Sequence, residues 1–242
     1  MHLVIDIGNT RAKYALFDHQ DNLVLRDVVL KRHAASVLKK VIPKYPVTAA
    51  IITGTSEIDD FLIRNLQEIS VFIHMDSNTK TPVKNLYLTP SLLGRDRLAA
   101  AVGAYKRFAG QSVLIIDMGT CITMNYLTSS GEFIGGNISP GIKMRLKAMH
   151  KFTARLPLVE IEIPAEDFGR NTVRALQNGA VKGAFREIDS FIDEIRIKYG
   201  LINIILTGGD AEMFESYTKN MIFVAPNLVL EGLNEILKYN VK

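Results

Sequence analysis

The chain has 242 residues, which suits one large or two small domains, and a core of this size needs no disulfide to be stable. Hydrophobic residues make up 48% of the chain and charged residues 22%, so the composition argues against disordered and collagen-like proteins. The net charge is +4 and no basic run is interleaved with aromatic residues, so we expect no nucleic-acid partner. No apolar run approaches the roughly 18 residues of a membrane span, so we expect no membrane partner.

The chain contains a single cysteine, Cys121, which cannot form an internal disulfide. No Cys/His cluster is present that could hold structural zinc. A lone thiol fits a reducing compartment, so the expected location is the cytoplasm. The first apolar run has no cationic stretch before it and soon meets Asp6, which predicts a buried strand rather than a signal peptide.

The first half of the chain is predicted to be a meander followed by alternating helices and strands. Residues 3–10 (LVIDIGNT) form an apolar strand that ends in a turn, and the alternating segments 11–18 and 23–30 continue it as antiparallel neighbours. Helical spacing then alternates with short apolar runs. The expected helices cover residues 33–42, 57–69 and 91–108, and the expected strands cover 49–53 and 71–75.

The second half repeats this plan. Residues 114–120 (LIIDMGT) echo residues 3–10, and a repeat on this scale indicates duplicated domains rather than a solenoid. The expected strands cover 121–127, 133–138, 203–207 and 221–225. Two helices are expected from Pro140 to about Lys151 and over 171–199, where Gly200 caps the second. Two more are expected after the turn at 208–211 and over 227–239. A hinge near Gly110 divides the predicted domains, residues 1–112 and 113–242.

Several familiar catalytic motifs are missing from the sequence. There is no P-loop, no G-x-G-x-x-G after the first strand, no H-E-x-x-H and no G-x-S-x-G. The five histidines fall in no metal-ligand spacing. The chemistry must therefore come from other motifs.

Residues 6–13 (DIGNTRAK) predict a phosphate-binding turn. Asp6 ends an apolar strand, where a buried carboxylate is costly unless it meets a cation or hydrogen-bond donors. Gly8 and Asn9 tolerate left-handed backbone and bring amides close to a ligand. Thr10 offers a hydroxyl and Lys13 a cation for phosphate oxygens. The alternative is a plain hairpin turn in which Asp6 accepts turn amides.

Two further turns have a similar composition. The segment 116–120 (IDMGT) ends a second acidic strand, and two such turns facing each other would make a nucleotide cleft. The segment 207–211 (TGGDA) places two glycines and an aspartate before a helix, which fits close approach to a nucleotide. An aspartate that only caps the helix after a flexible loop is the alternative for the last turn.

Residues 91–105 (SLLGRDRLAAAVGAY) combine charge with small side chains. Asp96 lies between Arg95 and Arg97, which favour its ionised form, and a weak base suffices for an alcohol acceptor in loose phosphoryl transfer. The alternative is a helix cap with two solvated arginines. The run of small residues from Ala99 to Ala104 predicts tight packing against another helix or backbone.

Together and in this order, the motifs DIGNT, GRDR, IDMGT, GGNISPG and TGGDA resemble those of the type III pantothenate kinase family, from residue 3 to about residue 232. The resemblance implies an α/β, duplicated ribonuclease-H-like (actin-like ATPase) fold of two domains with a central nucleotide cleft. It implies ATP-dependent phosphorylation of the pantothenate hydroxyl, the first step of coenzyme A biosynthesis, by a homodimer. It also implies Mg²⁺ with ATP and a monovalent cation, K⁺ or NH₄⁺.

The resemblance also implies roles for individual residues. The ATP-binding residues would be Asp6, Ile7, Gly8, Asn9, Thr10, Arg11, Ala12 and Lys13, with Thr120 on the second turn. Asp117 matches the position that holds the monovalent cation, and Asp96 matches the proton acceptor. The substrate-binding positions would be Tyr87, Gly94, Arg95, Asp96, Arg97 and Thr172. Arg95 departs from the small or apolar residue expected there, which leaves its role open.

Two other functions are compatible with these motifs. One is another small-molecule kinase or phosphatase of the actin-like superfamily, although the chain leaves little room for sugar-binding insertions. The other is a non-catalytic regulatory protein resembling Bvg accessory factors, which loss of Lys13 or Asp96 would have favoured. The apolar positions of 171–199 predict a dimer in which Phe185 lies on an outer face, unless this stretch only packs under the second sheet.

Overall fold

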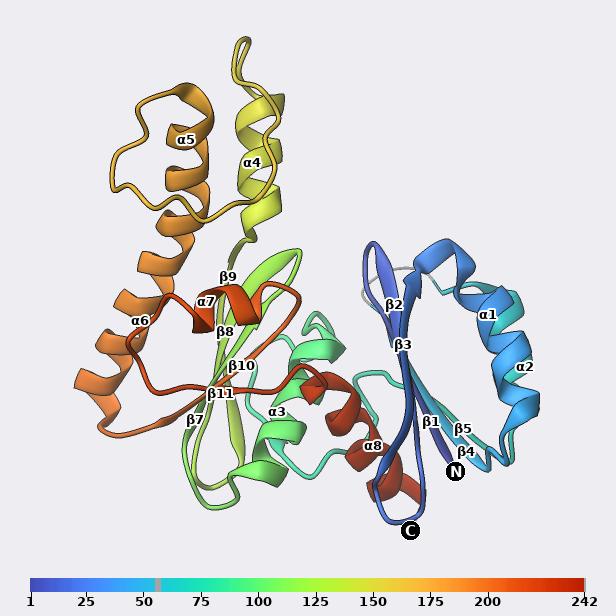
Figure 1. The fold of residues 1–242 in the computed structure, drawn as a ribbon. Coiled ribbons are helices and arrows are strands. Elements are labelled where there is room, and N and C mark those ends of the chain that lie inside the picture. The colour runs from blue at the N-terminus through green and yellow to red at the C-terminus, as the bar shows by residue number, and fades with distance from the viewer. Residues whose placement is uncertain (55–57, 242) are drawn as a thin grey trace. The chain divides into compact units, whose positions relative to one another are not determined.

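The computed structural model describes residues 1–54 and 58–241 and has an α/β architecture of two compact units (Figure 1). The first unit comprises Met1–Gln111, Leu127–Gly135 and Asn227–Lys242, and the second comprises Ser112–Tyr126 and Gly136–Pro226. The start of the predicted helix 57–69 and the last residue of the predicted 113–242 domain lie outside the described residues.

The first unit is built on a five-stranded sheet of order β3-β2-β1-β4-β5. Its strands are β1 (His2–Ile7), β2 (Arg11–Phe17), β3 (Leu23–Leu30), β4 (Ala49–Gly54) and β5 (Val71–His74). β1, β2 and β3 pair antiparallel, whereas β1, β4 and β5 pair parallel. The predicted meander is therefore confirmed.

Helices cover this sheet. They are α1 (Ala34–Val41), α2 (Asp60–Gln67), α3 (Arg95–Arg107) and α8 (Leu228–Val241), with 3-10 turns at Lys31–His33 and Ile42–Lys44. Leu3, Ile5 and Ile7 of β1 form one core cluster with residues of α1 and α2. In Figure 1 these two helices lie on the same side of the first sheet. Because side chains alternate along a strand, Asp6 lies on the opposite face.

α3 and α8 pack backbone to backbone, as the small residues of α3 predicted. A Cβ at Gly103 would lie 2.5 Å from the carbonyl oxygen of Leu228, and a Cβ at Gly232 would overlap the carbonyl oxygen of Ala99. The ion pair between Arg107 and Glu231 (2.7 Å) joins the same two helices. The predicted domain division placed 227–239 in the second domain, whereas α8 packs within the first unit.

The second sheet has the order β11-β10-β7-β8-β9-β6. Its strands are β6 (Lys84–Asn85), β7 (Val113–Met118), β8 (Cys121–Leu127), β9 (Glu132–Pro140), β10 (Asn203–Thr207) and β11 (Phe223–Val224). The order β9-β8-β7-β10-β11 repeats the order β3-β2-β1-β4-β5, so the sequence echo corresponds to a repeated strand order. β6, which the sequence did not predict, pairs with β9 in the part of the hairpin that belongs to the first unit.

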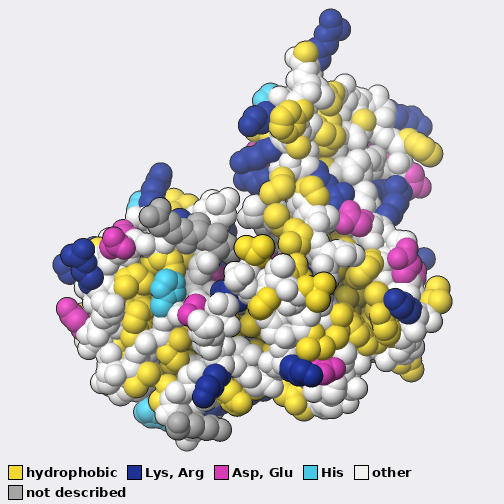
Figure 2. Space-filling model, turned by 180° about the vertical axis from the view of Figure 1, so that it is seen from behind, with side chains coloured by type: hydrophobic (Ala, Val, Ile, Leu, Met, Phe, Trp, Pro, Cys, Tyr) yellow, Lys and Arg dark blue, Asp and Glu magenta, His cyan; other side chains and the backbone are white. Residues whose placement is uncertain are grey.

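Five helical segments complete the second unit. They are α4 (Ile142–Lys151), α5 (Thr172–Gln177), a π-helical turn (Asn178–Lys182), α6 (Gly183–Tyr199) and α7 (Ala211–Glu215). Pro140 ends β9, so α4 begins two residues later than expected. Hydrophobic side chains gather on the surface of the part that holds α4, α5 and their connection (Figure 2). Within the described residues, no helix is long and apolar enough to cross a bilayer.

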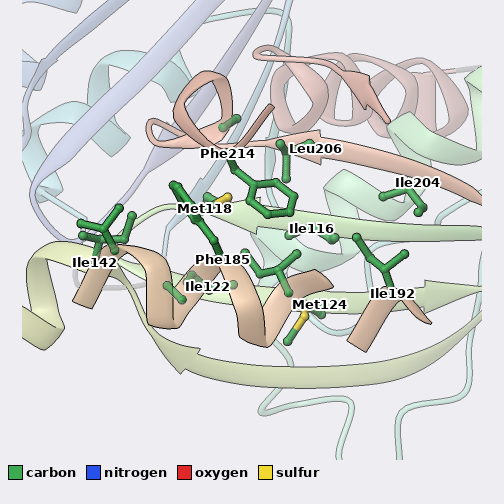
Figure 3. Packing of buried hydrophobic residues seen from close by; sticks show 14 of the residues in the cluster. Ile116, Met118, Ile122, Met124, Ile142, Phe185, Ile192, Ile204, Leu206 and Phe214 are labelled. Atoms are coloured by element: carbon green, nitrogen blue, oxygen red, sulfur yellow. The ribbon is translucent and has the colours of Figure 1, made fainter. Parts of the chain in front are cut away.

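Phe185 lies in the core of the second unit, not on an outer face (Figure 3). Its side chain is 0% exposed, and its ring centroid lies 5.4 Å from that of Phe214 and 4.8 Å from that of Tyr217. The prediction that Phe185 faces a dimer partner is therefore wrong. Residues of α7 and of the connection between α4 and α5 belong to the same hydrophobic cluster as the buried residues of this helical stretch.

Candidate functional site

The predicted phosphate turn joins β1 to β2. Asp6, 8% exposed, lies directly opposite Lys13 in the antiparallel pair, so the two side chains share one face of the sheet. The amide of Gly8 donates to the carbonyl oxygen of Arg11 (2.9 Å), and a Cβ at Gly8 would lie 3.0 Å from that oxygen. Neither Gly8 nor Asn9 has a positive φ, so the expectation of left-handed backbone is wrong. The contact at Gly8 leaves little room for a side chain, because the Arg11 carbonyl would have to move by a few tenths of an ångström.

The side chains of this turn differ in their exposure to solvent. Ile7 and Ala12 are buried in the core, so only their backbone is available to a ligand, whereas Asn9, Thr10 and Arg11 are exposed. A cavity of about 780 Å³ borders the turn; it is lined by Asn9, Thr10, Leu30, Lys31, Arg32, Ile58, Asp59 and Asp60. The lining combines two cations, Lys31 and Arg32, with two carboxylates, Asp59 and Asp60, so its formal charges balance.

Gly94 and Asp96 form a close pair at the start of α3. Gly94 is the N-cap residue, and Asp96 lies in the first helical turn. A Cβ at Gly94 would lie 2.5 Å from Oδ1 of Asp96, so any side chain at 94 would displace the carboxylate. Oδ1 accepts the amide of Arg97 (2.9 Å), and the helix N-terminus favours the negative charge. Asp96 is thus held as a fixed acceptor of hydrogen bonds.

Arg95, whose role the sequence left open, braces the loop that precedes α3. Its guanidinium donates to the carbonyl oxygens of Pro90 (3.0 Å) and Ser91 (3.1 Å). These two bonds tie the first residue of the helix to the loop before Gly94. The structure therefore gives this side chain a local contact with the backbone.

Tyr87 and Arg97, which the sequence analysis both assigned to the substrate, lie in contact. The guanidinium carbon of Arg97 lies 5.4 Å from the ring centroid of Tyr87 and 6.0 Å from that of Phe133. Arg97 is only 6% exposed. Sequence reasoning did not find Phe133, although this residue stands two positions before the GGNISPG motif.

The second turn, between β7 and β8, is enclosed by two other segments of the second unit. Gly208 has φ +99°, and a Cβ there would lie 2.5 Å from Oδ1 of Asp117. The amide of Asp210 donates to the carbonyl oxygen of Met118 (3.0 Å), and the amide of Gly141 donates to that of Thr120 (3.1 Å). The structure thus brings the TGGDA and IDMGT motifs together.

Each strand-end aspartate has a buried threonine beside it on the neighbouring parallel strand. Asp6 is in register with Thr53, and Asp117 is in register with Thr207. Both threonines are 1% exposed. The sequence analysis missed Thr53; the signal was the Thr-Gly pair at 53–54, which repeats at 207–208.

Thr172 lies on a different element of the second unit, at the first position of α5. The side chain of Asn171 caps this helix by accepting the amide of Arg174 (2.9 Å). Gly169 approaches the helix so closely that a Cβ would overlap the amide of Ala175. The backbone before Thr172 is therefore fixed from both sides.

The backbone of Gly208 lies against the carboxylate of Asp117. A Cβ at Gly208 would lie 2.5 Å from Oδ1 of Asp117, so only glycine fits beside this side chain. In the described part of the chain, no three His, Cys, Asp or Glu side chains converge on a metal position.

Asp210→Asn is expected to raise the melting temperature at pH 7. Burial raises the pKa of Asp210 above its ordinary value, and Lys143 opposes this only in part. A raised carboxyl pKa means that folding favours the protonated acid, so stability falls as the pH rises through the folded-state pKa. Thermal unfolding from pH 4 to pH 8 should show the advantage of Asp210→Asn shrinking toward low pH.

Asp76→Asn is the control, and it should lower the melting temperature at pH 7 rather than raise it. Amides of Asn78 and Thr79 hydrogen-bond to this exposed carboxylate and lower its pKa. The stability that this group contributes is present above the ordinary pKa and is lost in acid. A melting temperature at pH 7 that falls in Asp210→Asn would contradict the assigned effect of burial.

Solved structures share the fold of this chain. One is described as a conserved Baf family transcriptional activator from Campylobacter jejuni, with a TM-score of 0.62 at 22% identity, covering 99% of this chain and 98% of that one. Another is the activator of 2-hydroxyisocaproyl-CoA dehydratase from Clostridium difficile with bound ADPNP, with a TM-score of 0.55 at 13% identity over 98% and 93%. The chain therefore has the two-domain, actin-like α/β fold that the resemblance implied.

Sequence relatives are more specific. A type III pantothenate kinase from Bacteroides fragilis is 44% identical over 241 residues, which cover 99% of this chain and 98% of the relative. A type III pantothenate kinase from Phocaeicola vulgatus is 38% identical over the full length of both chains. The sequence profile named type III pantothenate kinase matches residues 2–194. This chain belongs to the type III pantothenate kinase family.

Proposed function

We propose that this protein transfers the γ-phosphoryl group of ATP to the hydroxyl of pantothenate, the first step of coenzyme A biosynthesis. The observation that carries the proposal is family membership over nearly the whole chain, at up to 44% identity to relatives named for this activity. The close pairing of Gly94 with Asp96 at a helix start supports it, because this pairing fixes a carboxylate where an acceptor hydroxyl can meet it.

In the proposed reaction the pantothenate hydroxyl oxygen forms a bond to the γ-phosphorus while the bond from phosphorus to the β–γ bridging oxygen breaks. ADP leaves, and Asp96 accepts the hydroxyl proton. The transition state is loose, so position and positive charge matter more than the strength of the base. Lys13 and the exposed residues of the first turn bind the phosphates. Tyr87, Arg97 and Thr172 bind pantothenate.

Mg²⁺ that arrives with ATP supplies positive charge to the phosphate oxygens. Asp117 would hold the monovalent cation, K⁺ or NH₄⁺. The close backbone of Gly208 limits the space on one side of its carboxylate. Thr120, in the turn between β7 and β8, would be the ATP-binding residue of that second turn.

ADP release measured with and without pantothenate tests the function. Release that depends on pantothenate, with one phosphorylated product per ADP, is the expected result. Release that depends on a sugar instead would indicate another kinase of this superfamily. ATP that stays intact with every alcohol offered would favour the regulatory alternative.

Activity should require potassium or ammonium, with most of it lost in sodium at constant ionic strength. A site sized for a large, weakly hydrated cation fits sodium poorly. Initial rates in the chloride salts of K⁺, NH₄⁺ and Na⁺ measure this, with choline chloride holding the ionic strength. Equal rates in sodium and potassium would remove the monovalent-cation role from Asp117.

The proposed assembly is a homodimer formed through the surface around α4 and α5. Large apolar side chains are exposed there, namely Phe152, Leu158, Phe168 and Val173. Exposed apolar side chains that gather on one part of a surface favour that part as an association site. Thr172 adjoins this surface, so a second copy could complete the pantothenate site.

Phe168→Glu should convert the dimer to a folded monomer and raise the KM for pantothenate more than that for ATP. Phe168 is 85% exposed, so the change buries no charge within one chain. Ile197→Glu is the matched control, because Ile197 is 87% exposed on α6 in the same unit. Light scattering after size exclusion gives the mass. A wild-type monomer, or equal masses for wild type and Phe168→Glu, would refute the interface.

Two further assignments go with this function. The proposed location is the cytoplasm, where the lone Cys121 stays reduced and the substrates of this pathway occur. Residues 1–112 and 113–242 are proposed as two ribonuclease-H-like repeats, with the last helix of the second packing on the first. The repeated strand order supports the duplication.

A further inference from the structure

The segment that carries Tyr87 is docked on strand β9 within the first unit. The amide of Leu86 donates to the carbonyl oxygen of Phe133 (2.9 Å), and the amide of Lys84 donates to that of Gly131 (2.9 Å). The Lys84 ammonium also pairs with Glu132 (2.9 Å). The position of Tyr87 therefore depends on a hairpin more than forty residues further along the chain.

Phe133 holds the aromatic and cationic groups of this cluster together. Its side chain is fully buried, and its ring centroid lies 6.4 Å from that of Tyr87. The guanidinium of Arg97 lies within reach of both rings, at 5.4 and 6.0 Å. Such cation–π contacts restrict a long, flexible side chain to one place.

The ring of Tyr87 packs against the backbone at Gly135. The φ of Gly135 is +128°, and a Cβ there would lie 3.1 Å from Cδ2 and 3.3 Å from Cε2 of Tyr87. A methyl group would therefore push the ring by a few tenths of an ångström and strain the backbone. The position of the Tyr87 ring therefore requires that residue 135 has no side chain.

We propose that Phe133 and Gly135 are positioning residues for the phosphoryl acceptor: they fix Arg97 and Tyr87 and thereby the place of pantothenate. This inference rests on the proposed function, which assigns those two side chains to pantothenate. Phe133 and Gly135 are both buried, so the proposal gives neither of them a contact with the acceptor. Their effect reaches it through Tyr87 and Arg97.

Gly135→Ala and Gly110→Ala form a matched pair that tests the proposal. Gly110 lies in the first unit with φ +77°, and a Cβ there would meet no heavy atom within 4 Å. Both variants should lose thermal stability, because both strain the backbone. Only Gly135→Ala presses on Tyr87, so only this variant should lower kcat/KM for pantothenate, by roughly 10- to 100-fold, while the KM for ATP stays unchanged.

Phe133→Leu, compared with Phe17→Leu, gives a second measurement if Gly135→Ala fails to fold. Phe17 is also a buried phenylalanine of the first unit, 3% exposed at the end of β2. Both changes shorten a core side chain, but only the first removes a ring from Arg97. A rise in the pantothenate KM confined to Phe133→Leu supports the proposal.

The outcomes separate this inference from the function on which it rests. Suppose that wild type phosphorylates pantothenate, but each β9 variant changes the KM for pantothenate and the KM for ATP only as much as its control variant does. The positioning role is then overturned and the function stands. If folded wild type releases no ADP in response to pantothenate, both are overturned.

Discussion

Asp96→Asn should lower kcat for pantothenate phosphorylation by about 10²–10⁴-fold, the usual loss when a general base is removed. The change keeps the size of the side chain, and its amide oxygen can still accept the Arg97 amide that Oδ1 accepts in wild type. The start of α3 and the cluster around Arg97 should therefore persist. Only the capacity to accept the hydroxyl proton is lost.

Two measurements distinguish this result from damage to the fold. The ATP affinity of Asp96→Asn should match that of wild type, because Asp96 is assigned to the acceptor side of the reaction. Its melting temperature should fall only slightly, because a negative charge in the first turn of a helix contributes about 0.3–1 kcal/mol. Asp76→Asn makes the same chemical change at a turn aspartate of the first unit and should keep wild-type turnover. An Asp96→Asn enzyme with more than half of wild-type turnover would disprove the base assignment.

Local patterns predicted most of the secondary structure. Alternation along residues 11–18 and 23–30 identified β2 and β3, and the echo at 114–120 pointed to the repeated strand order. Gly200 ends α6 with φ +78°, as expected of a helix-terminating glycine. In each case the determining interactions lie within a few residues of one another.

The errors arose where distant segments decide the outcome. The apolar positions of 171–199 indicated an outer partner, but the buried ones form one cluster with residues of α7 and of the connection between α4 and α5. Phe185 is therefore buried by residues of its own chain that its sequence spacing cannot reveal. For the same reason, the packing of α8 on α3 could be inferred from small residues only as an unnamed contact.

In the candidate site, too, contiguous motifs could be predicted from the sequence and contacts between distant segments could not. Motif composition identified Asp6 and Lys13 as candidate residues and drew attention to the TGGDA turn, because each motif is contiguous. The contact of Phe133 with Tyr87 and Arg97 joins two parts of the chain that share no motif. Supporting residues of this kind are determined by tertiary packing, and a single sequence contains no periodic signal for them.

Gly232→Ala should have the largest effect on stability. An added Cβ would overlap the carbonyl oxygen of Ala99, and backbone atoms of α3 cannot rotate away as a side chain would. The two helices would have to separate, which exposes buried apolar residues on both. We expect a loss of about 3 kcal/mol, near the upper end for overpacking, and a melting temperature lower by roughly 6–12 °C.

Gly183→Ala should change stability in the opposite direction. Gly183 has helical φ and ψ (−62°, −46°), and a Cβ there would meet no heavy atom within 4 Å. Alanine restricts the unfolded chain and favours the helix, so we expect a gain of about 0.4–1 kcal/mol. Urea unfolding of both variants measures the difference. If Gly232→Ala were as stable as Gly183→Ala, α3 and α8 could not approach backbone to backbone, because an overlapping methyl group would then cost nothing.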